Sequence, residues 1–192
     1  MNNLWKIGTQ KAYYGYVGML LIELIGGLIL GMMEPSPLEV LMGEGSGYLA
    51  TSIFFGTAAI AALVYYFMGI KEMKDAAVNS SIAEGTNRLF IAGILLVIGQ
   101  FLGFFIGALG SLVGFVGFIV AWSGYALIKK NAANANAQMG GDKLTTSALL
   151  SFVAALCAFI PAIGWIIAGV LEFVALYYAL QGWKDLANSE LE

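Results

Sequence analysis

The sequence predicts an all-α integral membrane protein with six transmembrane helices arranged as three like-oriented helical hairpins. Three observations predict this: the composition, six long apolar stretches, and positive charges confined to one side of them. Of 192 residues, 60% are hydrophobic and 11% are charged, whereas soluble domains contain about 45–50% apolar and about 25% charged residues. A soluble fold of this length cannot hide so much apolar surface from water.

Six stretches of the chain are apolar enough, and long enough, to cross a bilayer, which takes about 20 residues of helix. Two pairs of them run together without a charged residue between. From Arg88 to Lys129 the chain has no charge for about 40 residues, so it must turn back midway. Turn-forming residues lie at Gly107–Ser111 and Pro161–Gly164. The predicted spans are residues 12–33, 48–70, 88–108, 109–128, 144–163 and 164–183.

The positive charges predict the orientation of these spans. With six spans, every lysine and arginine falls on one side, and the positive-inside rule makes that side the cytosol. We therefore expect a cell-membrane protein whose N- and C-termini are both cytosolic. The basic residues are Lys6, Lys11, Lys71, Lys74, Arg88, Lys129, Lys130, Lys143 and Lys184.

The one long connection on the opposite side, residues 34–47, carries glutamates and no positive charge. Its Ser36-Pro37-Leu38-Glu39 segment is typical of a capping box with proline at the first helical position. We expect a short amphipathic helix on the outer membrane surface. It is either a solvated connector with an apolar underside, or a functional element that serves as an acidic cation site or an entry lid.

The cytosolic connections are predicted to be short and irregular. The second span is expected to continue for a turn or two before Gly85 breaks it. Residues 129–142, rich in Ala and Asn and ending near Gly140 and Gly141, are typical of a flexible linker. Asn87 or Asp142 is expected to cap the helix that follows.

An internal repeat accompanies this topology. The second helix of each pair ends in aromatic residues, a small residue and a lysine, and the first begins at Lys11, Arg88 or Lys143. We infer parallel repeats, unlike the inverted repeats of many transporters. The predicted hairpins, residues 12–70, 88–128 and 144–183, form one transmembrane domain over residues 1–192.

Three polar residues are predicted at one depth near the middle of the membrane. Glu23 lies 12 residues after Lys11, Gln100 lies 12 after Arg88, and Glu172 lies 12 before Lys184. At about 1.5 Å per residue, each is about 18 Å from the cytosolic boundary. An ionised group there costs at least about 2.5–3.5 kcal/mol, so such residues seek partners inside the protein. They form either a proton- or cation-coupled site or a set of hydrogen bonds between helices.

Glycines spaced four residues apart line the third and fourth predicted spans. They are Gly103 and Gly107, then Gly110 and Gly114. Small residues at this spacing let helix backbones approach closely. We expect them to pack helices within the hairpin, with docking of a second copy as the alternative.

The composition excludes several function classes. The chain has no histidine and one cysteine, Cys157, which removes histidine-based catalysis, histidine metal sites and internal disulfides. No dense basic run is present, so nucleic-acid binding is not expected. We expect no enzymatic activity, no cofactor and no metal.

The segment from Phe159 through Pro161 and Trp165 to Tyr178 resembles hairpins in families of small, uncharacterised prokaryotic multi-pass membrane proteins built of helical hairpins. The resemblance covers about 30 residues around Pro161–Tyr178. It implies a hairpin-repeat membrane protein and carries no activity to transfer.

Two functions remain open from the sequence. The first is a non-enzymatic multi-pass protein acting by association: self-assembly, membrane organisation or support of a partner complex. Short loops, the lack of reactive residues and glycine-lined helices favour it. Its partners would be the lipid bilayer and a second copy or another membrane protein. The alternative is a small proton- or cation-coupled carrier or channel that uses Glu23, Gln100 and Glu172.

Overall fold

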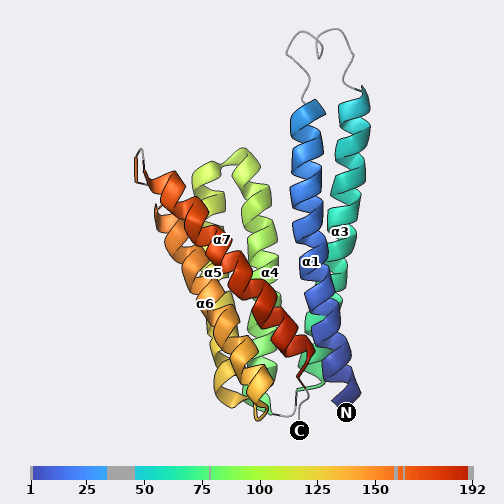
Figure 1. The fold of residues 1–192 in the computed structure, drawn as a ribbon, viewed down its shortest axis with the longest axis vertical. Coiled ribbons are helices and arrows are strands. Elements are labelled where there is room, and N and C mark those ends of the chain that lie inside the picture. Colours follow the sequence, from blue (N-terminus) through green and yellow to red (C-terminus); the bar gives the residue numbers. More distant parts are fainter. Residues whose placement is uncertain (1, 34–45, 78, 158–159, 162, 190–192) are drawn as a thin grey trace. The chain divides into compact units, whose positions relative to one another are not determined.

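The computed structural model describes residues 2–33, 46–77, 79–157, 160–161 and 163–189. The described residues form six α-helices, which confirms the all-α class (Figure 1). The predicted outer helix within residues 34–47 lies outside the described residues, except that Ser46 already begins a helix. The helices are α1 (Asn2–Met33), α3 (Ser46–Asp75), α4 (Ser80–Phe105), α5 (Gly107–Asn131), α6 (Ala135–Cys157) and α7 (Gly164–Ala187).

The chain divides into two compact units. Unit 1 comprises Met1–Tyr13 and Phe67–Glu192, and unit 2 comprises Tyr14–Tyr66. In unit 1, α4 packs against α5, α5 against α6, and α6 against α7. In unit 2, α1 packs against α3, where a Cβ on Gly26 would lie 3.0 Å from the ring of Phe55. The single transmembrane domain inferred from the sequence stays a prediction.

Five of the described helices are long and apolar enough to cross a membrane: α1, α3, α4, α5 and α7. Helix α6 differs because its first nine residues, 135–143, are mostly polar or small. Its apolar part starts at Leu144 and reaches Cys157, which is shorter than the roughly 20 residues a span needs. Residues 158, 159 and 162 of the predicted fifth span lie outside the described residues.

The helices continue well past the predicted spans at their basic ends, and two predictions about the connections are wrong. Gly85 does not break a helix, because it lies inside α4. Residues 129–142 are not a flexible linker, because α5 continues to Asn131 and α6 already begins at Ala135. Only three residues, 132–134, separate the two helices.

The caps lie earlier than predicted for the same reason. Asn79 caps α4, its side chain accepting a hydrogen bond from the backbone N–H of Ile82 at 2.8 Å. Asn134 does the same for α6, accepting from the N–H groups of Asn136 and Ala137 at 2.8 and 3.4 Å. Neither Asn87 nor Asp142 is a cap, since both lie in helix interiors.

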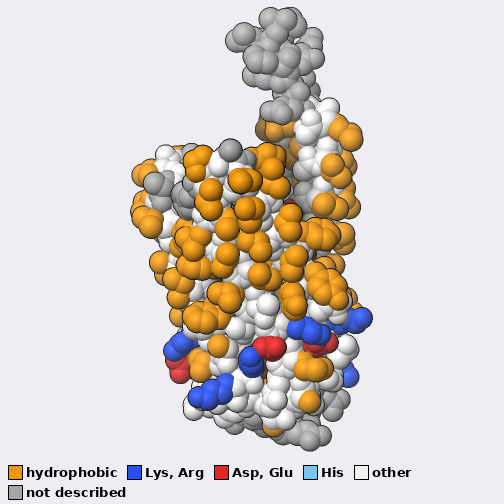
Figure 2. Space-filling model, turned by 60° about the vertical axis from the view of Figure 1, so that its left-hand side comes forward, with side chains coloured by type: hydrophobic (Ala, Val, Ile, Leu, Met, Phe, Trp, Pro, Cys, Tyr) orange, Lys and Arg blue, Asp and Glu red, His pale blue; other side chains and the backbone are white. Residues whose placement is uncertain are grey.

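The tightest core of unit 1 lies at its basic end, where α1, α4 and α6 begin and α3, α5 and α7 end. There the hydrophobic effect requires apolar side chains to be buried, whereas along a membrane span they can face lipid. Figure 2 shows hydrophobic side chains along the helices and charged side chains gathered at one end. The largest fully buried side chains are those of Trp5, Trp183, Ile70, Met73, Ile82, Leu89, Ile128, Leu144, Leu186, Thr9 and Thr86.

Candidate functional site

Glu172 lies on α7 and is bound to Ser151 on α6. The Ser151 hydroxyl donates a hydrogen bond to Glu172 Oε2 at 3.0 Å, and the pair is exposed. The pairing follows from α6 packing against α7. The surrounding outward face of α7 is apolar, with Trp165 69% and Phe173 75% exposed. A carboxyl group and a hydroxyl group therefore lie together on an otherwise apolar surface.

A shallow hollow lies beside this pair on α7. It is lined by Trp165, Ile166, Gly169, Val170, Phe173 and Val174. Among these residues, a Cβ on Gly169 would meet nothing within 4 Å. Trp165, Gly169 and Glu172 have i, i+4, i+7 spacing, so the edge of the hollow formed by Trp165 and Gly169 lies on the same face of the helix as the carboxyl. Another helix can therefore approach the backbone of α7 closely at Gly169, next to the carboxyl group of Glu172.

Gln100 lies on α4 and is exposed. It makes no hydrogen bond to the described residues. The preceding residue explains its direction: a Cβ on Gly99 would lie 2.9 Å from Gly114 N and 3.0 Å from Gly110 O, so Gly99 faces α5. One residue further along a helix points about 100° away. Gln100 lies on α4 and Glu172 on α7, and no hydrogen bond joins them among the described residues, so their meeting stays a prediction.

Glu23 belongs to unit 2, where it is exposed on α1 and has no hydrogen bond to the described residues. The face of α1 that meets α3 carries Gly15 and Gly26 instead, which approach Tyr66 and Phe55. Because Glu23 and the other two polar residues belong to different units, a common polar layer stays a prediction.

The predicted packing glycines differ in their surroundings. Gly110 is buried and approached by Gly99 of α4, whereas a Cβ on Gly107 or on Gly114 would meet nothing within 4 Å. The side-chain surroundings of Gly103 lie outside the described part of the chain. The close approach of α4 to α5 here centres on Gly99, which lies four residues before Gly103 but was not among the predicted packing glycines.

The basic end holds ion pairs that the sequence did not reveal. Lys11 pairs with Glu72, joining α1 to α3, and Lys143 Nζ lies 2.6 Å from Asp185 Oδ2, joining α6 to α7. The Glu72 Oε2 atom is buried and has no hydrogen-bond partner among the residues that the structure describes. Among the described residues, no group of three or more His, Cys, Asp or Glu side chains is placed to hold a metal ion. The two ion pairs hold neighbouring helices together at the boundary of the apolar region.

Comparison with known proteins gives no relative: no protein-family model, no curated sequence and no solved structure matches this chain.

Proposed function

We propose that this protein is a non-enzymatic multi-pass membrane protein that works by association, and that copies of the chain bind each other through the α6–α7 face containing Ser151 and Glu172. The proposal includes six membrane crossings as three like-oriented hairpins, with both termini in the cytosol of the cell that carries it. The outer part of α6 and the residues that follow would complete the sixth crossing.

The observation that supports association is the exposure of Glu172 on a helix apolar enough to cross a membrane. A carboxylate facing the middle of the bilayer costs at least about 2.5–3.5 kcal/mol. One hydrogen bond from Ser151 does not remove that cost, since interhelical hydrogen bonds in membranes contribute about 1 kcal/mol. A second protein surface over this face would remove the carboxyl from lipid.

A second copy of the chain fits this face by chemistry and by shape. A serine hydroxyl both donates and accepts hydrogen bonds, and a carboxyl accepts them, so the pair can bind its own copy across a two-fold axis. Gly169 leaves the backbone of α7 open next to the pair, which lets a partner helix approach closely. The neighbouring aromatic side chains Trp165 and Phe173 supply apolar contact area.

Association is tested by energy transfer between labelled copies in liposomes, over a range of protein-to-lipid ratios. Glu172→Leu and Gly169→Leu should each weaken association about tenfold or more, by removing the polar pair or filling the hollow. Gly56→Leu is the matched control, because a Cβ at Gly56 also meets nothing within 4 Å but lies on α3. An unmodified protein that stays monomeric at every ratio would rule the proposal out.

The carrier hypothesis makes a different prediction for the same liposomes. It requires a flux of protons or cations that Glu23→Gln or Glu172→Gln abolishes while folding is retained. Association predicts that no flux appears under any imposed gradient, while energy transfer between copies persists.

A further inference from the structure

Unit 1 contains three reciprocal glycine contacts at its basic end, one between the two helices of each hairpin. A Cβ on the glycine of the first helix would lie 2.8–2.9 Å from the carbonyl oxygen of the glycine on the second. The reverse distances are 2.6–2.9 Å, so neither position has room for a larger residue. The pairs are Gly8–Gly69 (α1 and α3), Gly85–Gly124 (α4 and α5) and Gly140–Gly182 (α6 and α7).

The residues around these glycines repeat in the same register. Each first-helix glycine lies three residues before the basic residue that begins the predicted span, as in Gly8 and Lys11, or Gly85 and Arg88. Four residues after the second-helix glycine, a large apolar side chain is always fully buried. These side chains are Met73, Ile128 and Leu186, each 0% exposed.

The first helices share further buried positions. Three residues before the glycine, Trp5, Ile82 and Ala137 are at most 1% exposed, and four residues after it, Ala12, Leu89 and Leu144 are at most 2% exposed. Thr9 and Thr86 follow their glycines directly, and each hydroxyl donates to backbone carbonyls three and four residues earlier. The three hairpins are therefore copies of one packing unit.

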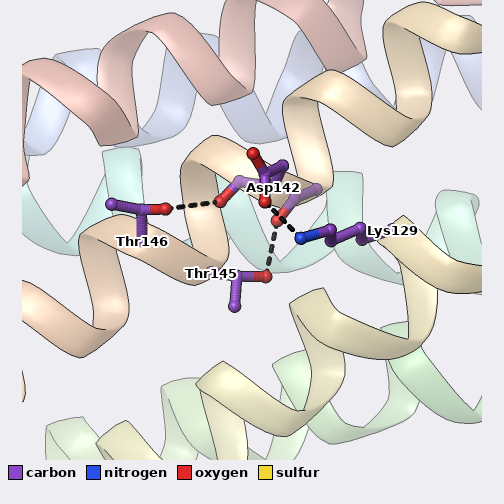
Figure 3. A network of polar contacts seen from close by, with 5 residues as sticks. Lys129, Asp142, Thr145 and Thr146 are labelled. Atoms are coloured by element: carbon purple, nitrogen blue, oxygen red, sulfur yellow. Dashed lines mark hydrogen bonds and ion pairs between the residues drawn. The ribbon is translucent and has the colours of Figure 1, made fainter.

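Consecutive hairpins are joined by the same contact. Lys74, five residues after Gly69, donates to Asn87, two residues after Gly85, at 2.8 Å. Lys129, five residues after Gly124, pairs with Asp142, two residues after Gly140 (Figure 3). Each contact joins the second helix of one hairpin to the first helix of the next.

The last hairpin also contacts the first, and again the end of a second helix lies against the start of a first helix. Trp5 Nε1 of α1 donates a buried hydrogen bond to Ser189 Oγ, just beyond α7, at 3.1 Å. The positions equivalent to the Lys–Asn and Lys–Asp pairs are Ala187 and Gln10, which cannot form an ion pair, so this junction uses a different bond.

We infer that the basic end is a closed ring of three hairpins, in which each second helix docks on the next first helix and α7 docks on α1. Each hairpin thus binds, at its basic end, the other two hairpins of the same chain. Because all three edges are used within one chain, a second copy cannot add to the ring and must bind elsewhere.

A circular permutant tests ring closure. The chain would begin at Asn79, continue to Ser189, pass through a linker of about six Gly and Ser residues to Asn2, and end at Ala77. It should yield folded protein within about twofold of the natural order, with a melting temperature within a few degrees. The control is interrupted at the same place, between Ala77 and Asn79, but lacks the linker from Ser189 to Asn2, so that it is co-expressed as two separate fragments. If the fragments assemble and the permutant does not, the ring is overturned.

Thiol cross-linking gives a decision that does not depend on the permutant folding. In a Cys157→Ser background, Trp5→Cys with Ser189→Cys should be joined by a short bifunctional reagent within one chain, in membranes. The matched control is Trp5→Cys with Asn131→Cys. Asn131 of the second hairpin is equivalent to Ser189 of the third, since each lies seven residues after its glycine. It should react at least about tenfold more slowly. Leu4→Cys replaces Trp5→Cys in both pairs if the latter does not fold. Equal rates would overturn the ring.

Discussion

At the residue scale, glycine has two different roles, which depend on whether another backbone lies where its Cβ would be. A Cβ on Gly124 would lie 2.8 Å from the backbone oxygen of Gly85 and 2.9 Å from Leu89 Cδ2. A Cβ on Gly114, in the same helix, would meet nothing within 4 Å. Glycine is required where two backbones meet and is merely tolerated where open space remains.

Gly124→Ala should therefore lower the free energy of unfolding by about 1–3 kcal/mol, because the new methyl group forces two backbones apart. Gly114→Ala should change it by less than about 1 kcal/mol, and in the stabilising direction, because alanine is the better helix former. Equilibrium unfolding in mixed micelles measures both. Equal losses for the two variants would contradict the assigned contacts.

At the element scale, helices α1, α4 and α6 begin about two to three turns before the apolar stretches. Asn79 and Asn134 end the connections, and the segments that follow are helical because their apolar and small residues pack at the basic end. Asn and Gly are common in loops, so their presence at residues 79–87 and 129–142 favoured irregular structure. Tertiary packing overrode that local preference, with Gly85 and Gly140 serving as contact points.

Asn79→Ala should destabilise the protein by about 1 kcal/mol, because it removes the cap of α4. The amide protons of the first turn, that of Ile82 above all, should exchange faster with solvent. Asn87→Ala is the comparison, since Asn87 was the predicted cap of this helix but accepts an exposed hydrogen bond from Lys74 instead. It should cost less than about 0.5 kcal/mol. A larger effect at Asn87 than at Asn79 would contradict the observed helix start.

At the scale of the whole molecule, the nine basic residues all belong to unit 1. The three glycine contacts bring the beginnings of α1, α4 and α6 to the ends of α3, α5 and α7. The charges thus gather at one end of the unit, and the positive-inside rule favours placing that end in the cytosol, as the proposed orientation does. The opposite end, between α4 and α5, carries the exposed Ile106.

Single cysteines in a Cys157→Ser background test the proposed orientation. In intact cells, a membrane-impermeant maleimide should label Ile106→Cys, at the end away from the charges. It should label Lys130→Cys only after the membrane is opened, because that residue would lie in the cytosol. The opposite labelling pattern would mean that the termini are outside.

The sequence by itself determined the class of protein, the helical content and the one-sided charge, because these depend on composition and on the length of apolar runs. It also determined where along each helix the polar residues lie, since each residue advances a helix by about 1.5 Å. Only the tertiary structure decided which way they face. The contact of Gly99 with α5 turns Gln100 outward, and the packing of α6 on α7 pairs Ser151 with Glu172. The helical ends and the link from Trp5 to Ser189 were likewise decided by packing, because contacts between residues 184 positions apart leave no local signal in the chain.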